Sequence, residues 1–245
     1  MTGFFVTGTD TGVGKTFATT GIVAALRARG LSVGAWKPVQ SGCLPDDPQA
    51  DSSELRNGAG LPDESAEIAS FSFPEPLTPA LAAKLAGVEL TLDAIAGACT
   101  LRHEHLLVEG AGGVFAPLTD DSLMIDLMVR LELPVIIVAR SGLGTINHSL
   151  LTINALRDRG LTIAGIVFNG HRDSPPEFAN FADLLRSPHA ANCELSNPLY
   201  VAQFGKVPIL GRLPWHDGPL QLRERVALLE CRLCLDALLP FLDPI

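Results

Sequence analysis

The sequence predicts an α/β fold, with a doubly wound and mainly parallel sheet in a single domain that spans residues 1–245. Short apolar runs alternate with helical stretches along the chain, and the runs lack the polar alternation of half-exposed strands. The 245 residues are 47% hydrophobic and 18% charged, which is enough to bury one sizeable core. Alternation of buried strands and helices indicates a parallel sheet covered by helices on both faces.

The predicted strands are rich in Val, Ile, Phe and Leu: Gly3–Thr7, Ser32–Lys37, His105–Glu109, Pro134–Ala139, Ile163–Asn169 and Val207–Gly211. The predicted helices lie between them: Lys15–Arg29, Ser52–Gly58, Leu92–Thr100, Leu123–Leu131, Ile146–Arg159 and Pro176–Leu185. Gly30 and Gly160 each follow a cationic last turn, which is a helix stop signal. A final amphipathic helical region, Leu220–Leu239, is expected to pack on the sheet edge.

The bulk charge argues against two classes of partner. The net charge is -9 and no Lys/Arg cluster stands out, so neither duplex nucleic acid nor an anionic membrane is expected to bind. The N-terminus has no basic region followed by a long apolar stretch, so no signal peptide is expected, and the apolar runs are too short to cross a bilayer. Together with an odd number of cysteines, five, this predicts a cytoplasmic protein with reduced thiols.

Two of the cysteines, Cys231 and Cys234, are spaced to share one face of a helix, where we expect them to pack as apolar side chains. No second cysteine pair lies nearby, which disfavours a zinc site.

The strongest motif is a glycine-rich segment, Gly8–Thr16, between a predicted strand and a predicted helix. Its glycines would expose backbone N–H groups to a phosphate, and the helix start would direct its positive dipole end at the same anion. Lys15 can reach β- and γ-phosphates, and the Thr16 hydroxyl can bind Mg²⁺. Five residues separate Gly8 from Gly14, where the common phosphate-binding loop has four. The alternative is a turn that caps a helix and binds nothing, and the motif alone does not select the nucleotide.

Two further charged residues end predicted strands at the sheet edge where α/β proteins bind ligands. Lys37 ends the second strand, where Pro38 is expected to stop the strand pairing, and a second cation there would suit phosphoryl transfer. It could equally be an ordinary exposed lysine. Glu109 ends the third strand, before several glycines, and is a candidate ligand for Mg²⁺.

Two aspartates are ambiguous on local grounds. Asp51 precedes Ser52, Ser53 and Glu54, which resembles a helix N-cap followed by Glu at the third helical position, and we prefer that interpretation from the local sequence. Asp10 lies inside the glycine-rich segment, where it could bind Mg²⁺, orient a water or brace loop amides. The long irregular stretch from Pro38 to Ala50 is interpreted as a functional loop.

Six blocks in order along the chain resemble the dethiobiotin synthetase family. They are Gly8–Thr16, Lys37–Gly42, Val108–Gly113, Leu143–His148, Gly165–Asn169 and Leu213–Trp215. The resemblance implies a P-loop NTPase type of fold and an ATP-dependent enzyme that joins CO₂ to 7,8-diaminononanoate and closes the ureido ring of dethiobiotin. An amine would take up CO₂, the carbamate would attack the γ-phosphate, and the neighbouring amine would close the ring.

The resemblance also assigns roles to residues. Lys37 and Lys15 are the implied catalytic lysines, and Thr16, Asp51 and Glu109 surround Mg²⁺, which reverses the local preference for Asp51. The implied ATP-binding residues are Gly12, Val13, Gly14, Lys15, Thr16, Phe17, Asp51, Glu109, Gly110, Ala111, Gly112, Asn169, Gly170, Leu213, Pro214 and Trp215. The implied substrate contacts are Thr11, Ser41, Gly144, Thr145, Ile146 and Asn147, the last four across a homodimer interface.

Two other functions stay open at this point. A partitioning-type ATPase switch shares the unusual loop, but its family places another lysine early in that loop, where this chain has Gly8, Thr9 and Asp10. An ATP-dependent ligase that amidates another carboxylate is the third candidate, although no glutamine-hydrolysing domain is evident. Asp173–Val207 matches no block of the family.

Overall fold

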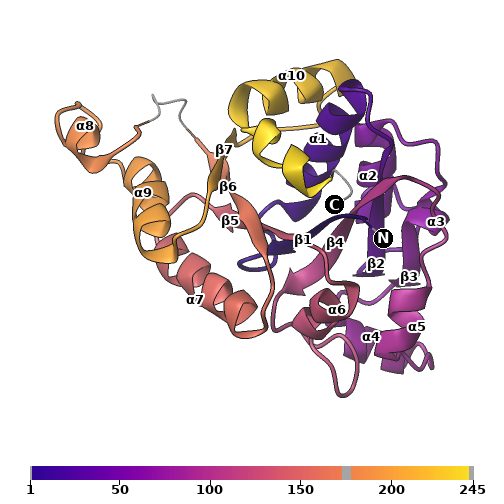
Figure 1. Cartoon of the computed structure of the whole chain (residues 1–245). Coiled ribbons are helices and arrows are strands. Elements are labelled where there is room, and N and C mark those ends of the chain that lie inside the picture. The colour runs from indigo at the N-terminus through magenta and orange to yellow at the C-terminus, as the bar shows by residue number, and fades with distance from the viewer. Residues whose placement is uncertain (1, 173–177, 243–245) are drawn as a thin grey trace.

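Seven strands form one sheet in the computed structural model, which describes residues 2–172 and 178–242 (Figure 1). The strands are β1 (Thr2–Gly8), β2 (Val33–Ser41), β3 (Ala69–Phe73), β4 (His105–Gly113), β5 (Val135–Arg140), β6 (Ile163–His171) and β7 (Ile209–Pro214). Their order is β3-β2-β4-β1-β5-β6-β7, and every neighbouring pair is parallel. The predicted α/β class with a doubly wound parallel sheet is therefore confirmed.

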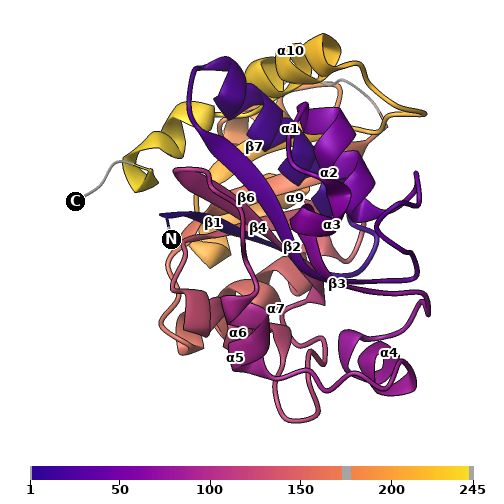
Figure 2. The same ribbon diagram turned by 90° about the vertical axis from the view of Figure 1, so that its right-hand side faces the viewer.

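Helices cover both faces of this sheet (Figures 1 and 2). They are α1 (Lys15–Ala28), α2 (Asp51–Ala59), α3 (Ser65–Ile68), α4 (Pro79–Leu85), α5 (Leu92–Gly97), α6 (Met124–Leu131), α7 (Thr145–Asp158), α8 (Phe181–Leu185), α9 (Cys193–Gly205) and α10 (Leu222–Arg232), followed by the 3-10 turns η1 (Leu235–Ala237) and η2 (Leu239–Phe241). Alternate residues of β1 face opposite layers: Phe4 and Val6 pack with α1, α2 and α10, whereas Phe5 packs with α5, α6 and α7. Both sides of the central strand are thus core, which explains its unbroken apolar sequence.

The second strand continues past Pro38, so the expectation that this proline ends the strand was wrong. Pairing of β2 with β4 stops at Trp36, and pairing with β3 runs from Lys37 to Ser41. Pro38 has no N–H to donate, and it lies where β2 changes its pairing partner. The functional loop predicted from Pro38 consequently begins only after Ser41.

Sequence reasoning missed β3, α3, α4 and α9. The β3 sequence is Ala-Ser-Phe-Ser-Phe, and only its first and last residues are buried, so it lacks the apolar run that marked the other strands. The predicted helix Pro176–Leu185 lies partly outside the described residues, and its described part is α8. Predicted boundaries of the other helices before residue 160 are correct to within three residues.

The C-terminal helix is shorter than predicted. Helix α10 ends at Arg232 because Leu233 turns extended and forms a bridge with Gly211 of β7. It packs mainly on α1 and also contacts β7, the edge strand. Cys231 and Cys234 are both exposed and only Cys231 lies in the helix, so their expected packing on one helix face was wrong.

Within the described residues, no helix is both long and apolar enough to cross a membrane.

Candidate active site

The glycine-rich segment forms an anion-binding loop between β1 and α1. Gly12 and Gly14 have φ of 73° and 90°, in the left-handed region that favours glycine. Gly14 is the N-cap of α1, and no side chain caps this helix or places an acid in its first turn. The amides at the helix start therefore stay available to an anion, as the motif predicts.

Two residues hold the loop in shape. The backbone N–H of Thr11 donates to Asp10 Oδ1 at 2.8 Å, and Lys15 Nζ donates to the backbone oxygen of Asp10 at 3.1 Å. Of the three roles open to Asp10, bracing a loop amide is the one for which there is a contact. Lys15 is only 7% exposed, and burial followed by the charge of Lys37 lowers its pKa to about 8.

Affinity for ADP should fall as the pH rises from about 7 to about 9.5. A bound phosphate favours the Lys15 ammonium, which the free protein loses as the pH passes about 8, so the loss approaches about tenfold per pH unit above that value. Calorimetric titration with ADP in Mg²⁺-free buffer measures it. Lys15→Met should bind weakly and show no such step, and a flat wild-type profile would contradict the assignment.

Lys37 lies buried between two carboxylates. Its Nζ is 2.7 Å from Glu109 Oε1 and 2.6 Å from Asp51 Oδ2, and the residue is 3% exposed. Burial acts to lower the pKa of Lys37, but the charges of Glu109 and Asp51 outweigh it and hold that pKa above its ordinary value. The same pairing holds the pKa of Asp51 below its ordinary value, against the opposing effect of burial. Lys37 is therefore a cation at neutral pH, and it is close enough to Lys15 to affect that lysine's pKa.

The three predicted metal ligands converge on one point from α1, α2 and β4. Thr16 Oγ1 lies 2.8 Å from Asp51 Oδ1 and 2.9 Å from Glu109 Oε1. Glu109 is fully buried, and its Oε2 has no hydrogen-bond partner among the described residues. Two carboxylates and a hydroxyl are hard oxygen ligands, so this set fits Mg²⁺. No group of three or more His, Cys, Asp or Glu that could hold a metal is found in the described part of the chain.

Asp51 is the first residue of α2 and not its N-cap, so the local preference was wrong. The N-cap is Ala50, and no side chain accepts a hydrogen bond there. The Asp51 carboxylate instead faces Thr16 and Lys37. Contacts from two other elements decide the orientation of this side chain.

The carboxyl ends of β6 and β7 form a second part of the candidate site, beside Gly14. Asn169 Nδ2 donates to the backbone oxygen of Val13 at 3.0 Å, and a Cβ on Gly14 would lie 1.9 Å from that nitrogen. Asn169 Oδ1 is buried and has no partner among the described residues, so it can accept a hydrogen bond from a ligand. Trp215 is 60% exposed and lies against Gly170.

Comparisons with known proteins agree with this geometry. The AAA domain family matches residues 2–219. The ATP-dependent dethiobiotin synthetase BioD of Bacillus licheniformis is 43% identical over 217 residues, which cover 87% of this chain and 86% of that protein. The enzyme of the same name from Anaeromyxobacter dehalogenans is 46% identical over 191 residues, 76% of this chain and 85% of that protein. A third, from Bacillus thuringiensis, is 37% identical over 227 residues, 91% of this chain and 88% of that protein.

This chain belongs to the dethiobiotin synthetase family. It is thus an ATP-dependent ligase with a P-loop fold. A solved MinC:MinD cell division protein complex from Aquifex aeolicus has a TM-score of 0.56 over 100% of this chain and 97% of that chain, at 14% identity. That likeness shows a shared fold and gives no support to a partitioning-type switch.

Apart from Thr11, which lies in the phosphate loop between β1 and α1, the substrate residues implied by the family fall in two separate places. Ser41 ends β2, and its hydroxyl donates to the backbone oxygen of Leu77 at 2.7 Å. Gly144–Asn147 lie at the start of α7, after β5. Strands β4 and β1 lie between β2 and β5, which separates the two places by about 14 Å at the usual strand spacing.

The start of α7 is built to attract an anion. Gly144 is the N-cap with φ of 87°, and neither a capping side chain nor an acid occupies the first turn. Thr145 is fully buried, and its Oγ1 has no partner among the described residues. A 360 Å³ cavity lies beside this helix, and it is lined by Thr9, Asp10, Gly113, Val114, Phe115, Ala116, His148, Leu151 and Thr152.

Several of these neighbours were missed from the sequence. His148, at the end of the block Leu143–His148, and Phe115 and Leu151 line the cavity, but sequence reasoning assigned none of them a role. Arg140 ends β5 beside Gly144, and its Nη2 lies 3.3 Å from His148 Nδ1. A basic residue at the carboxyl end of a predicted strand was the signal that could have found Arg140.

Not every implied contact presents its side chain to the pocket. Leu213 is fully buried in the core beneath α1 and α10, so only its backbone is available to a nucleotide. The Phe17 ring packs under the Arg225 guanidinium. Gly110 has the Phe5 ring against it, and Gly112, with φ of 67°, lies near Thr11.

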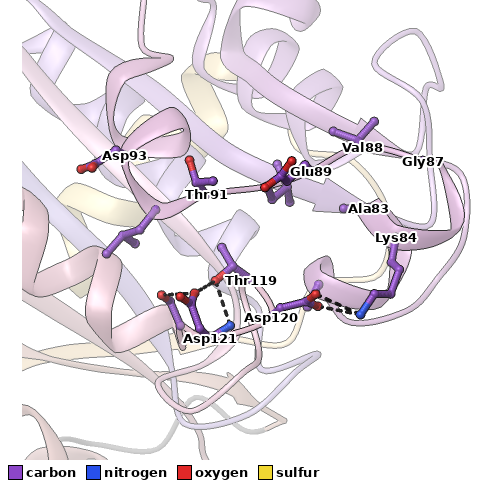
Figure 3. A pocket seen from close by; sticks show the side chains of 14 residues that line it. Ala83, Lys84, Gly87, Val88, Glu89, Thr91, Asp93, Thr119, Asp120 and Asp121 are labelled. Atoms are coloured by element: carbon purple, nitrogen blue, oxygen red, sulfur yellow. Dashed lines mark hydrogen bonds and ion pairs between the residues drawn. The ribbon is translucent and has the colours of Figure 1, made fainter.

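A cavity of 680 Å³ elsewhere in the molecule contains none of the predicted site residues (Figure 3). It lies between α4, the start of α5 and the loop at residues 119–122. Three of its charged side chains have partners within the cavity wall. Lys84 forms an ion pair with Asp120, and Asp121 accepts hydrogen bonds from Thr119 and Ser122. None of its lining residues belongs to the phosphate loop, so it is not part of the candidate active site.

Proposed function

We propose that this chain catalyses the ATP-dependent carboxylation and ring closure of 7,8-diaminononanoate with CO₂, which yields dethiobiotin, ADP and phosphate. The observation that carries the proposal is the buried Lys37 ammonium, held by Glu109 and Asp51 next to the phosphate loop. Family membership supplies the reaction, and the pocket supplies two cations where the transferred phosphoryl group would lie.

The chemistry needs positioning and charge more than a covalent intermediate. One substrate amine adds to CO₂ and becomes a carbamate, whose oxygen attacks the γ-phosphorus while ADP leaves. The neighbouring amine then attacks the carbonyl carbon of the anhydride, phosphate leaves and the ring closes. Lys15 and the loop amides would hold the β- and γ-phosphates, and Lys37, which stays protonated, would stabilise negative charge on the carbamate and the transferred group.

Mg²⁺ is the metal that the Thr16, Asp51 and Glu109 oxygens suit best. When bound, it would neutralise charge on the phosphates. Lys37 and Lys15 together balance the charge of the two carboxylates, so the phosphates of a bound nucleotide would supply the negative charge that favours a divalent cation. Asn169 Oδ1, with no partner of its own, would accept a hydrogen bond from the adenine amino group.

The reaction is tested by mass-spectrometric detection of dethiobiotin made from the diamine, bicarbonate and MgATP. The expected result is equal amounts of dethiobiotin and ADP, with neither formed when bicarbonate is left out. ATP hydrolysis that is independent of both the diamine and bicarbonate would overturn the proposal. Release of ADP only with a different carboxylic acid and an ammonia donor would favour an amidating ligase.

We also propose a cytoplasmic homodimer in which the start of α7 from one subunit completes the substrate site of the other. Within one chain, Ser41 and the start of α7 follow strands that are separated by β4 and β1. Large apolar side chains beside the start of α7 are exposed: Leu143 is 80% exposed, and Phe115 and Leu151 are each 60% exposed. Such a patch next to an anion-attracting helix start is suited to a subunit interface.

The double variant Leu143→Asp/Leu151→Asp should be monomeric in sedimentation velocity and should lose at least about tenfold in turnover, because buried charges disrupt an apolar interface. Its affinity for ADP should fall much less than its turnover, because Lys15 and the amides at the start of α1 are unchanged, although Leu151 shares a cavity with Thr9 and Asp10. Leu85→Asp, at an exposed leucine on α4, is the matched control and should leave both properties intact. A wild-type monomer with full turnover would refute the shared site.

A further inference from the structure

A buried arginine on α10 contacts both helices that carry Mg²⁺ ligands. Arg225 is 2% exposed, and its Nη2 lies 2.5 Å from Glu54 Oε1 on α2. Its guanidinium carbon lies 5.3 Å from the centre of the Phe17 ring on α1. Arg225 thus pairs with one carboxylate and covers one aromatic face, at the junction of three helices.

Both residues that Arg225 contacts lie close in sequence to a proposed metal ligand. Phe17 directly follows Thr16, and Glu54 lies three residues after Asp51, almost one turn along α2. Gly58 on α2 has no side chain that could obstruct this ion pair. A Cβ at that position would lie 3.0 Å from Arg225 Nη2 and 3.0 Å from Glu54 Oε1. The glycine lets the arginine reach across α2.

A buried cation with incomplete pairing is costly for stability alone. Arg225 Nε and Nη1 are buried and have no hydrogen-bond partner among the described residues. Removing a guanidinium from water costs several kcal/mol, which one carboxylate and one ring offset only in part. An apolar side chain of the same volume would pack this junction without that cost, so stability does not by itself account for the arginine.

The start of α2 is held to β2 by two hydrogen bonds, in which the Ser52 N–H donates to Gln40 Oε1 and Gln40 Nε2 donates to Ser52 Oγ, and its ion pairs add charged links. Ala50 provides no side-chain cap, and the segment before it is largely exposed. Among the described residues, the printed ion pairs of α2 are Asp51 with Lys37, Glu54 with Arg225 and Arg56 with Glu64. Only the second of these fixes α2 against α10, which itself packs on α1. Arg225 therefore adds a charged link between α1 and α2, through Phe17 and Glu54, to the direct packing of these two helices beside Thr16 and Asp51.

We propose that Arg225 is a positioning residue that sets the spacing between Thr16 and Asp51 and thereby the affinity of the site for Mg²⁺. This inference rests on the proposed function only in taking those two residues as Mg²⁺ ligands. Its test requires nucleotide and metal but neither the diamine nor bicarbonate, so it can fail while dethiobiotin formation stands, and the reverse.

The experiment measures ADP binding by calorimetry twice, once with excess Mg²⁺ and once with EDTA, in the full-length protein. In Arg225→Met, the gain in ADP affinity due to Mg²⁺ should shrink by roughly tenfold, as for other residues that orient metal ligands. Affinity in EDTA should stay within about twofold of the wild type, because the phosphate loop is unchanged. Arg225→Lys keeps a cation near Glu54 and should restore part of the gain.

Two further variants keep the test decisive. Glu54→Gln removes the carboxylate from a partly exposed position, and it should reduce the Mg²⁺-dependent gain in the same direction even if Arg225→Met does not fold. Arg223→Met changes an exposed arginine of the same helix and should leave the gain unchanged. A lower melting temperature with an unaltered Mg²⁺ gain in Arg225→Met and Glu54→Gln would show a purely structural role and overturn the proposal.

Discussion

Replacing Lys37 by methionine should reduce dethiobiotin formation by roughly 10²- to 10³-fold, because it removes a fixed positive charge from the centre of the reaction. The same change should strengthen Mg²⁺-dependent ADP binding. In the wild type, the Lys37 ammonium shares Glu109 and Asp51 with the metal site, and its removal leaves both carboxylates to the metal. Steady-state turnover and calorimetry with MgADP measure the two effects.

Opposite changes in turnover and in metal-dependent binding separate a catalytic role from a folding defect. A variant that simply unfolds would lose both. Lys84→Met is the matched control, since Lys84 is an exposed lysine paired with Asp120 at the 680 Å³ cavity, and its loss should alter neither quantity. Wild-type turnover in Lys37→Met would remove the proposed mechanism.

Changing Glu109 to glutamine should abolish most of the stabilisation that Mg²⁺ adds to that given by ADP alone, and should reduce turnover by roughly 10²-fold or more. Glutamine keeps the shape but removes the charge from a fully buried side chain whose Oε2 is free for a metal. Thermal unfolding with and without MgADP measures the change. Stabilisation by ADP in EDTA should persist because the loop amides and Lys15 are untouched.

Glu109→Gln should also lower the intrinsic stability by roughly 1–3 kcal/mol, because Lys37 loses a charged hydrogen-bond partner. Asp51 still pairs with that ammonium, so the variant should fold. If MgADP raised the melting temperature of Glu109→Gln as much as that of the wild type, Glu109 would not be a metal ligand.

Local sequence fixed the phosphate loop because its requirements are local. A left-handed glycine before a helix, free amides at the helix start and a lysine within the same turn all follow from Gly12–Lys15 without reference to distant residues. The same holds for most strands, whose apolar runs reflect burial on both faces. The positions of Lys37 and Glu109 at strand ends permitted several roles for each. The resemblance to a family selected a catalytic role for Lys37 and a metal-binding role for Glu109.

The pairing of distant residues could not be obtained from local pattern. Asp51 resembled a helix cap, and it became a neighbour of Thr16 and Lys37 only because α2 packs on α1 and β2 lies beside β4. Pro38 resembled a strand end, yet β2 continues by exchanging β4 for β3. Strand β3 had too short and too polar a sequence to stand out.

The sequence by itself thus determined where most strands and helices lie along the chain, which loop binds a phosphate and which charged residues lie at the sheet edge. The tertiary structure decided which charges meet: Lys37 with Glu109 and Asp51, Asn169 with the loop, and Arg225 with Glu54. The physical reason is the distance along the chain over which each property is determined. Backbone conformation depends on neighbours within a few residues, whereas the pairing and the pKa of a buried ion depend on groups that only the packed sheet and helices bring together.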